Sequence, residues 1–192
     1  MICWDADDFG ANHVISDMCQ SHDCRDQLDK FHIANPNFKA TLFAIPFEMT
    51  QEMMWWCYNN RSWVELAVHG FFHSSNYECE KIPYEDFASN MDIMNTLINN
   101  PLNFFTKGFK APGWQISDDC YKWLKDNGWW VADQAYNNDR RPKDLPVYII
   151  GDNSMHHHTW NCVGNGVYEQ EEYILDRIKD ETEFRFVSEM VI

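Results

Sequence analysis

The chain has 192 residues, of which 45% are hydrophobic and 16% aromatic, and this composition is sufficient for a buried core. Its 15 Lys and Arg against 30 Asp and Glu leave a formal net charge of -15, and such a field repels phosphate backbones and anionic lipid headgroups. Binding to nucleic acid or to a membrane surface is therefore not expected. No apolar run approaches the roughly 20 residues of a membrane span, and the first residues lack a signal-peptide pattern. We expect a cytoplasmic protein, with release by lysis or another export route left open.

Neither an internal repeat nor a linker rich in Gly, Ser or Pro divides the sequence, so residues 1–192 are expected to form a single domain. The seven cysteines are an odd number without a repeated spacing, in a chain large enough to fold without disulfides. We expect reduced thiols. His13, Cys19, His22 and Cys24 lie close together, but no second pair of ligands completes a structural zinc site.

Short apolar or β-branched runs alternate with helical patterns, which is typical of an α/β protein. Strands are expected at 1–4, 40–45, 64–68, 108–111, 129–132, 147–150 and 184–187. Helices are expected at 50–59, 84–99, 117–127 and 168–179. Parallel strands with right-handed crossovers form either a barrel or an open doubly wound sheet. Both place reactive groups at the carboxyl ends of the strands.

An acidic cluster follows the first expected strand, with Asp5, Asp7 and Asp8 in four positions before Gly10. Adjacent carboxylates repel one another unless a cation or protons neutralise them. A solvated acidic turn is one interpretation. The other is a site in which one Asp binds a metal ion and its neighbour acts as a general base.

Two histidines follow the third expected strand, at His69 and His73. Side chains four residues apart face the same way on a helical turn, so both imidazoles can reach one ion. Two unrelated core or surface histidines are the alternative. With a carboxylate from the acidic cluster, the pair completes an Asp-His-His site that leaves positions open for water.

The next strand ends in Lys110-Ala111-Pro112-Gly113-Trp114. An ordinary turn with a core Trp accounts for this segment on its own. In a functional interpretation, Lys110 orients the catalytic Asp through a salt bridge and Trp114 offers a flat apolar wall to a substrate.

Three consecutive histidines, His156 to His158, follow the expected strand at 147–150. In an extended segment the side chains of His156 and His158 share one face, and His157 points to the other. One of that pair could protonate a leaving group, although polar loop histidines are the alternative.

Taken in this order, the segments resemble the polysaccharide deacetylase family, the NodB-homology domain of carbohydrate esterase family 4. Asp7-Asp8 is similar to the Asp-Asp of the first family motif, and residues 40–43 to its second-strand signature. His69 and His73 match the metal-binding pair. Residues 110–114 resemble the Arg-x-Pro-x-Gly segment, and His156 to His158 lie where the last catalytic His is expected. The resemblance covers roughly residues 1–160.

The resemblance implies a distorted (β/α) barrel and a metal-dependent hydrolase that removes acetyl from an N-acetylated sugar. It implies that Asp8, His69 and His73 bind a divalent metal, zinc in most of the family. Asp7 would be the base and His158 or His156 the acid. Lys110 would assist Asp7. The substrate wall would comprise Pro112, Gly113, Trp114 and Trp160.

The sequence also departs from the family pattern. The first motif reads Asp-Ala-Asp-Asp-Phe-Gly in place of Thr-Phe-Asp-Asp-Gly. The sequence therefore leaves open which of Asp5, Asp7 and Asp8 is the base and which is the metal ligand. Lys110 replaces the Arg of the family, and a Lys cannot make the same bidentate contact with a carboxylate. Two other functions stay open: a metal-assisted hydrolase of a non-sugar amide or ester, and a catalytically silent carbohydrate-binding relative. The oligomeric state is not predicted.

Overall fold

The computed structural model describes residues 1–10, 23–73, 77–98, 104–151, 154–160, 164 and 166–192, together with the backbone of two short strands, β2 (Val14–Ser16) and β3 (Cys19–Gln20). Three of the four residues considered above for a zinc site, His13, Cys19 and His22, lie outside the side chains that the structure describes. Within the described residues, no helix has the length and apolar character needed to cross a bilayer.

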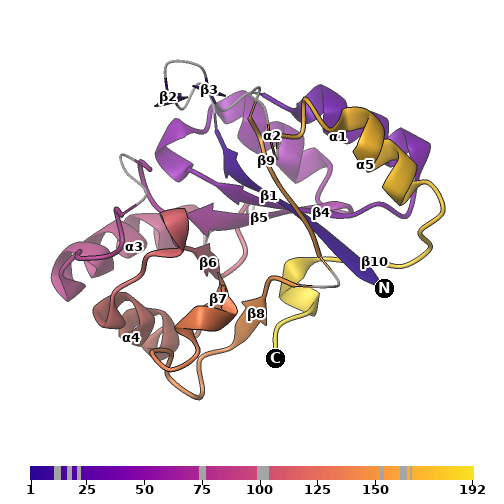
Figure 1. Cartoon of the computed structure of the whole chain (residues 1–192). Coiled ribbons are helices and arrows are strands. Elements are labelled where there is room, and N and C mark those ends of the chain that lie inside the picture. Colours follow the sequence, from indigo (N-terminus) through magenta and orange to yellow (C-terminus); the bar gives the residue numbers. More distant parts are fainter. Residues whose placement is uncertain are drawn as a thin grey trace.

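A curled parallel sheet forms the centre of the molecule (Figure 1). Its strands lie in the order β10 (Phe184–Arg185), β1 (Ile2–Phe9), β4 (Ala40–Ala44), β5 (Val64–His69), β6 (Gly108–Lys110), β7 (Trp130–Asp133) and β8 (Val147–Ile149). The remaining strand of this sheet, β9 (Ser154–His158), pairs with β1. All of these pairings are parallel. The sheet curls into a half-barrel, which confirms the expected distorted barrel.

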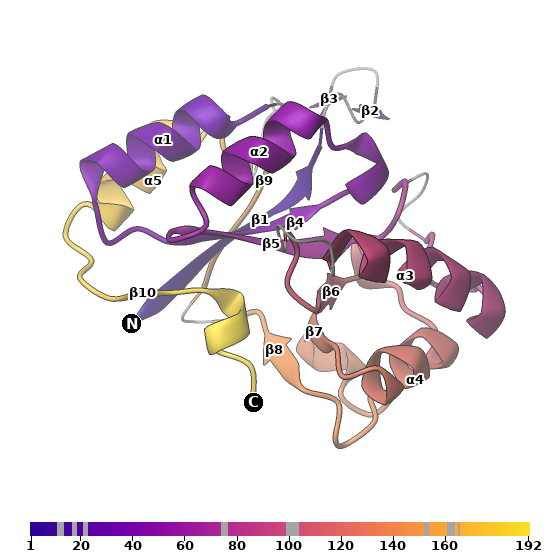
Figure 2. The same cartoon turned by 180° about the vertical axis from the view of Figure 1, so that it is seen from behind.

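Five α-helices cover the outer face of the described sheet (Figure 2). They are α1 (Arg25–Ala34), α2 (Gln51–Asn59), α3 (Tyr84–Ile98), α4 (Asp118–Asp126) and α5 (Glu171–Ile178). Single 3-10 turns follow several strands, at Pro46–Glu48, Pro112–Trp114, Ala135–Asn137 and Val187–Glu189. Thr50 and Ser117 cap α2 and α4 by accepting hydrogen bonds from Met53 N and Cys120 N.

Two clusters of buried side chains fill the molecule. The larger lies between the sheet and the helices, and aromatic rings such as Trp4, Phe31 and Phe38 contact one another edge to face there. The smaller fills the interior of the half-barrel; its buried members are Cys3, Phe43, Ala67, Trp130, Ala132, Tyr148 and Val187. Cys3 Sγ lies 2.6 Å from the Tyr148 hydroxyl oxygen, which links β1 to β8 across this interior.

Some sequence-based expectations need correction. The strand expected at 1–4 continues to Phe9, so the acidic cluster lies within β1 and not in a turn after it. The segment of His156 to His158 is a strand of the sheet, and α1 was not expected at all. The described cysteines, Cys3, Cys24, Cys57, Cys79 and Cys120, are buried, and no disulfide joins any two of them.

Candidate active site

The interior face of β1 carries the site. Because alternate residues of a strand share a face, Cys3, Asp5 and Asp7 follow one another along the interior of the barrel. Cys3 packs in the apolar interior cluster, and the two carboxylates lie beyond it toward the carboxyl end of the strand. Asp5 is fully buried and Asp7 is 3% exposed, so the interpretation as a solvated turn is wrong.

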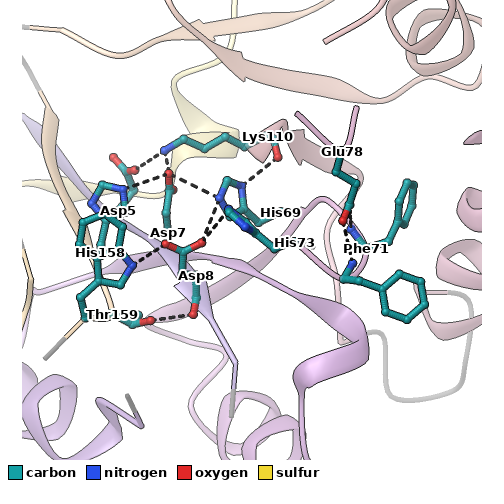
Figure 3. A network of polar contacts seen from close by, with 12 residues as sticks. Asp5, Asp7, Asp8, His69, Phe71, His73, Glu78, Lys110, His158 and Thr159 are labelled. Atoms are coloured by element: carbon teal, nitrogen blue, oxygen red, sulfur yellow. Dashed lines mark hydrogen bonds and ion pairs between the residues drawn. The ribbon is translucent and has the colours of Figure 1, made fainter. Parts of the chain in front are cut away.

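Asp8 would face the opposite side of the sheet if β1 were regular. The pairing with β4 is regular up to Ala6, shifts register, and resumes at Phe9, and Asp8 has a φ of 64°. A bulge of this kind re-aims a side chain, and Asp tolerates the left-handed conformation better than most residues. Thr159 holds the bulge, because its Oγ1 donates to the Asp8 carbonyl at 2.7 Å. Two neighbouring carboxylates thereby enter the same site (Figure 3).

His69 ends β5, and His73 follows it in a tight loop. The loop is not the helical turn that the spacing suggests, because Gly70 and His73 have φ values of 64° and 48°. Glu78 holds this loop by accepting hydrogen bonds from Phe71 N at 2.5 Å and Phe72 N at 3.2 Å. A Cβ at residue 70 would lie 2.5 Å from Glu78 Oε1 and 2.6 Å from Pro112 Cγ, so the loop requires glycine there.

Asp8, His69 and His73 converge with all three side chains buried. Asp8 Oδ1 lies 3.4 Å from His69 Nε2 and 3.2 Å from His73 Nε2. Ligands about 2.1 Å from a tetrahedral zinc ion are themselves about 3.4 Å apart. The distances in the site therefore fit the donor spacing around one small divalent ion.

The His69 tautomer supports a cation at this position. Its Nδ1 lies 3.0 Å from the Lys110 carbonyl oxygen, which can only accept, so the Nδ1 proton is donated there. In the neutral ring, Nε2 then points its lone pair at Asp8 Oδ1, a buried oxygen without a hydrogen-bond donor among the described residues. Two facing lone pairs require a cation between them, which is either a metal ion or a proton on Nε2. Asp8, His69 and His73 thus fit the metal site expected from the sequence.

Lys110 extends from β6 to the two interior carboxylates and is itself fully buried. Its Nζ lies 2.5 Å from Asp7 Oδ1 and 3.2 Å from Asp5 Oδ1 (Figure 3). Burial alone would raise the pKa of Asp5, but the charges of Lys110 and His156 hold that pKa at about 2. The same balance of burial against Lys110 lowers the pKa of Asp7. The expected salt bridge between Lys110 and Asp7 is present.

The charges of the site also favour a single divalent ion. Counting the Asp and Lys side chains alone, three ionised carboxylates and one ammonium leave two excess negative charges at the buried end of the barrel. The negative charge of these carboxylates acts on His69. Burial lowers the pKa of this imidazole, but Asp7 and Asp8 more than offset that effect, so its pKa is raised. One divalent cation neutralises the excess, which a buried site needs.

β9 brings the remaining histidines into the site. His156 and His158 stand opposite Asp5 and Asp7 in the parallel register, and both rings face the interior. His157 faces the other side, where it is buried and stacks on Trp4, so the expected alternation is confirmed. Burial lowers the pKa of His158 to about 4, and the charge of nearby Asp7 only partly opposes this.

The expected substrate wall surrounds this network. Lys110 Nζ lies 4.3 Å from the centre of the Trp114 ring, a cation–π contact. Trp114 belongs to the 3-10 turn Pro112–Trp114, in which Pro112 is buried and Gly113 is exposed. Trp160 stacks on His158 with ring centroids 3.9 Å apart, and its indole Nε1 donates to Asp8 Oδ2 at 2.7 Å. Trp114 and Trp160 therefore lie beside the carboxylates and histidines of the site, and Pro112 and Gly113 belong to the turn that carries Trp114.

Sequence reasoning missed the roles of two polar residues at this site. Glu78 secures the loop of His69 and His73, and Thr159 secures the bulge at Asp8. Asp5 was only one of three candidate carboxylates, and the structure places it away from the group of Asp8, in contact with Lys110 and His156. A signal was present for Asp5, since an acid two positions before Asp7 shares its face. None was present for Glu78, whose carboxylate accepts hydrogen bonds from the backbone of Phe71 and Phe72.

No family model and no curated protein sequence matches this chain. Solved structures match it over nearly its whole length. A peptidoglycan N-acetylglucosamine deacetylase named Bc1960 has a TM-score of 0.64 at 14% identity, covering 98% of this chain and 86% of its own. The chitin deacetylase of the fungus Colletotrichum lindemuthianum has a TM-score of 0.61 at 13% identity, with 97% and 85% covered.

A third similar structure is a carbohydrate esterase family 4 pseudoenzyme from Bacillus anthracis, with a TM-score of 0.64 at 12% identity and coverage of 98% and 64%. The chain therefore has the fold of the carbohydrate esterase family 4 deacetylases, as the resemblance implied. Because active and silent proteins share this fold, the function has to be argued from the site.

Proposed function

We propose that this protein is a divalent-metal-dependent hydrolase that removes the acetyl group from an N-acetylated sugar. The observation that carries the proposal is the convergence of Asp8, His69 and His73 beside Asp7 at a buried end of the barrel. Structural similarity to deacetylases of peptidoglycan N-acetylglucosamine and of chitin supports a sugar amide as the substrate class.

Asp8, His69 and His73 would hold the ion, and zinc suits their nitrogen and oxygen donors. A divalent ion bound there polarises the amide carbonyl and lowers the pKa of a neighbouring water. Lys110 holds Asp7 Oδ1, which leaves Oδ2 to accept a proton from the attacking water. His156 or His158 gives a proton to the departing amine, which is a poor leaving group without it. The residues present thus supply a base, an acid and a site for the ion.

The aromatic residues around the carboxylates account for sugar binding. Trp114 is half-buried beside Lys110, on the turn of Pro112 and Gly113. Trp160 is half-buried on the opposite side, against His158. Flat apolar side chains of this kind suit the hydrophobic face of a sugar ring.

Two other functions use the same observations. A metal-assisted hydrolase of a non-sugar amide or ester needs the same ion, base and acid, since the fold does not set the substrate. A silent carbohydrate-binding protein keeps the aromatic wall without turnover, and the pseudoenzyme with this fold supports that alternative. The complete set of ion-binding and proton-transfer residues favours an enzyme.

The test is metal analysis of the purified protein together with acetate release from N-acetylglucosamine oligomers, with and without chelator. We expect about one equivalent of divalent metal and chelator-sensitive acetate release. Asp7→Asn should retain the metal and lose turnover by about 10²-fold or more, because general base catalysis is removed. The matched control is Asp139→Asn, which alters an exposed carboxylate. Bound metal without acetate release indicates another amide or ester, and no metal after reconstitution indicates the silent binder.

A further inference from the structure

The two candidate proton donors on β9 are held in different ways. His156 Nδ1 lies 2.7 Å from Asp5 Oδ1, its partner in the register between β9 and β1. His158 Nδ1 is buried and has no hydrogen-bond partner within the part of the chain that the structure describes. His158 is instead fixed by stacking on Trp160. Only His156 has a hydrogen bond that determines which ring nitrogen carries the proton in the neutral form.

The proton on His156 can be assigned from its neighbours. Asp5 is fully buried beside Lys110, and its ionised carboxylate can only accept a hydrogen bond. Lys110 Nζ lies 3.3 Å from His156 Nδ1, but a lone pair on Nδ1 would be repelled by the Asp5 carboxylate oxygen, which is closer at 2.7 Å. The 2.7 Å contact therefore takes the Nδ1 proton to Asp5. His156 Nε2 is left facing Asp7 Oδ2 at 3.7 Å, inside the site.

We propose that Asp5 is a positioning residue that selects His156, and not His158, as the proton donor of the reaction. The inference rests on the proposed function. As the C–N bond of the amide breaks, its electron pair goes to the nitrogen, which takes the proton from His156 Nε2. His156 becomes neutral and keeps its other proton on Nδ1, where Asp5 accepts it. Asp5 acts through His156 and has no contact with substrate.

The first measurement needs no turnover. The ring nitrogens of uniformly ¹⁵N-labelled protein, loaded with zinc, are assigned by NMR and followed through pH. We expect His156 in its neutral form to carry the proton on Nδ1, with an Nδ1–H signal that exchanges slowly with water. Asp5→Asn should weaken that protection, because a charge-assisted hydrogen bond becomes a neutral one. A neutral His156 protonated on Nε2 would overturn the proposal, and this result comes from the unsubstituted protein even if Asp5→Asn fails to fold.

The second measurement is the kinetics of acetate release from N-acetylglucosamine oligomers. Asp5→Asn should lower kcat by about 10- to 100-fold, the scale found for residues that orient a reacting group, with KM and metal content little changed. His156→Ala should reduce kcat more than His158→Ala, with Asp139→Asn as the control.

Unchanged kcat in Asp5→Asn, together with loss of turnover in His158→Ala, would show that His158 is the donor and that the proposal is wrong. Absence of acetate release from the unsubstituted, zinc-loaded protein contradicts the proposed function instead. In that case the NMR measurement still decides whether Asp5 sets the His156 tautomer. The two failures are therefore distinguishable.

Discussion

At the scale of single residues, the site depends on polar atoms that lack partners unless a cation is present. Asp8 Oδ1 is buried without a hydrogen-bond donor among the described residues, and His69 Nε2 faces it at 3.4 Å. Burying such atoms is costly without compensation. Asp5 and Asp7 differ from Asp8 in having a permanent cation beside them, because Lys110 Nζ contacts Oδ1 of both. We therefore expect the ion to bind at Asp8 and the proton transfer to occur at Asp7.

His69→Ala should weaken zinc binding by more than about 100-fold, because loss even of a residue that only supports a ligand costs 10- to 100-fold in affinity. Zinc content after dialysis, measured by mass spectrometry, gives the result. His32→Ala is the matched control, since His32 stacks on Trp63 with centroids 4.3 Å apart and lies outside the group of Asp8, His69 and His73. A full equivalent of zinc in His69→Ala would contradict the assignment of the ligands.

At the scale of elements, the sequence predicts the strands better than the way in which they bring the site together. The strands expected at 40–45 and 64–68 match β4 and β5 to within one residue at each end, because buried parallel strands are continuous apolar runs. The first strand was predicted too short because Asp disfavours strands. In the structure it continues through Asp5 and Asp7 because Lys110, more than a hundred residues away, contacts them.

Other features carry no local signal at all. The bulge that turns Asp8 into the site is held by Thr159. β9 consists mainly of polar residues, and it is a strand because β1 offers an edge to pair with. α1 begins at Arg25, and its N-cap residue, Cys24, makes no side-chain hydrogen bond to the helix, so the usual start signal is missing. The strands that carry the candidate residues were therefore largely predictable, and the loops and bulges that bring those residues together were not.

The loop between His69 and His73 offers a test at this scale. Gly70→Ala should both strain the backbone at a φ of 64° and place a Cβ 2.6 Å from Pro112 Cγ, which displaces His73 from the ion. We expect a loss of zinc affinity, measured by competition with a fluorescent chelator. Gly128→Ala is a matched control: it has a similar φ, 69°, but no atom within 4 Å of the added Cβ.

Gly128→Ala should therefore bear only the conformational cost, on the order of 1 kcal/mol in unfolding free energy, with zinc affinity unchanged. If Gly70→Ala bound zinc as tightly as Gly128→Ala, the loop geometry would not control the site. The pair separates the effect of backbone strain from that of the close approach to Glu78 and Pro112.

At the scale of the whole molecule, the barrel interior is apolar at one end and charged at the other. Cys3 and Tyr148 belong to the apolar part, and the last turn of the described chain, Val187–Glu189, adds Val187 to it. Glu65 ties this turn to the sheet: it accepts hydrogen bonds from Thr41 Oγ1 at 2.9 Å and Ser188 N at 3.3 Å, and also from the Ser188 hydroxyl. Segments more than a hundred residues apart are joined there, so Glu65 bears on the stability of the entire fold.

Burial raises the pKa of Glu65, the hydrogen bonds from Ser188 and Thr41 oppose this only in part, and Glu189 adds to the rise. The folded protein therefore holds this proton more tightly than the unfolded chain. The unfolding free energy should fall as pH rises from below the ordinary glutamate value of 4.5 through the raised pKa. Above that pKa, the ionised Glu65 contributes a constant penalty.

Glu65→Gln should remove this pH-dependent penalty and keep the contacts, because the amide oxygen can accept from Thr41 while the amide nitrogen donates to the Ser188 hydroxyl. We expect a gain on the order of 1 kcal/mol at neutral pH that shrinks toward zero or reverses below pH 4.5. Urea unfolding of both proteins through this pH range gives the difference. Glu85→Gln, at an exposed glutamate of α3, serves as the control and should show no such trend. A difference that grows as pH falls would mean that the ionised Glu65 stabilises the fold, the opposite of what its burial predicts.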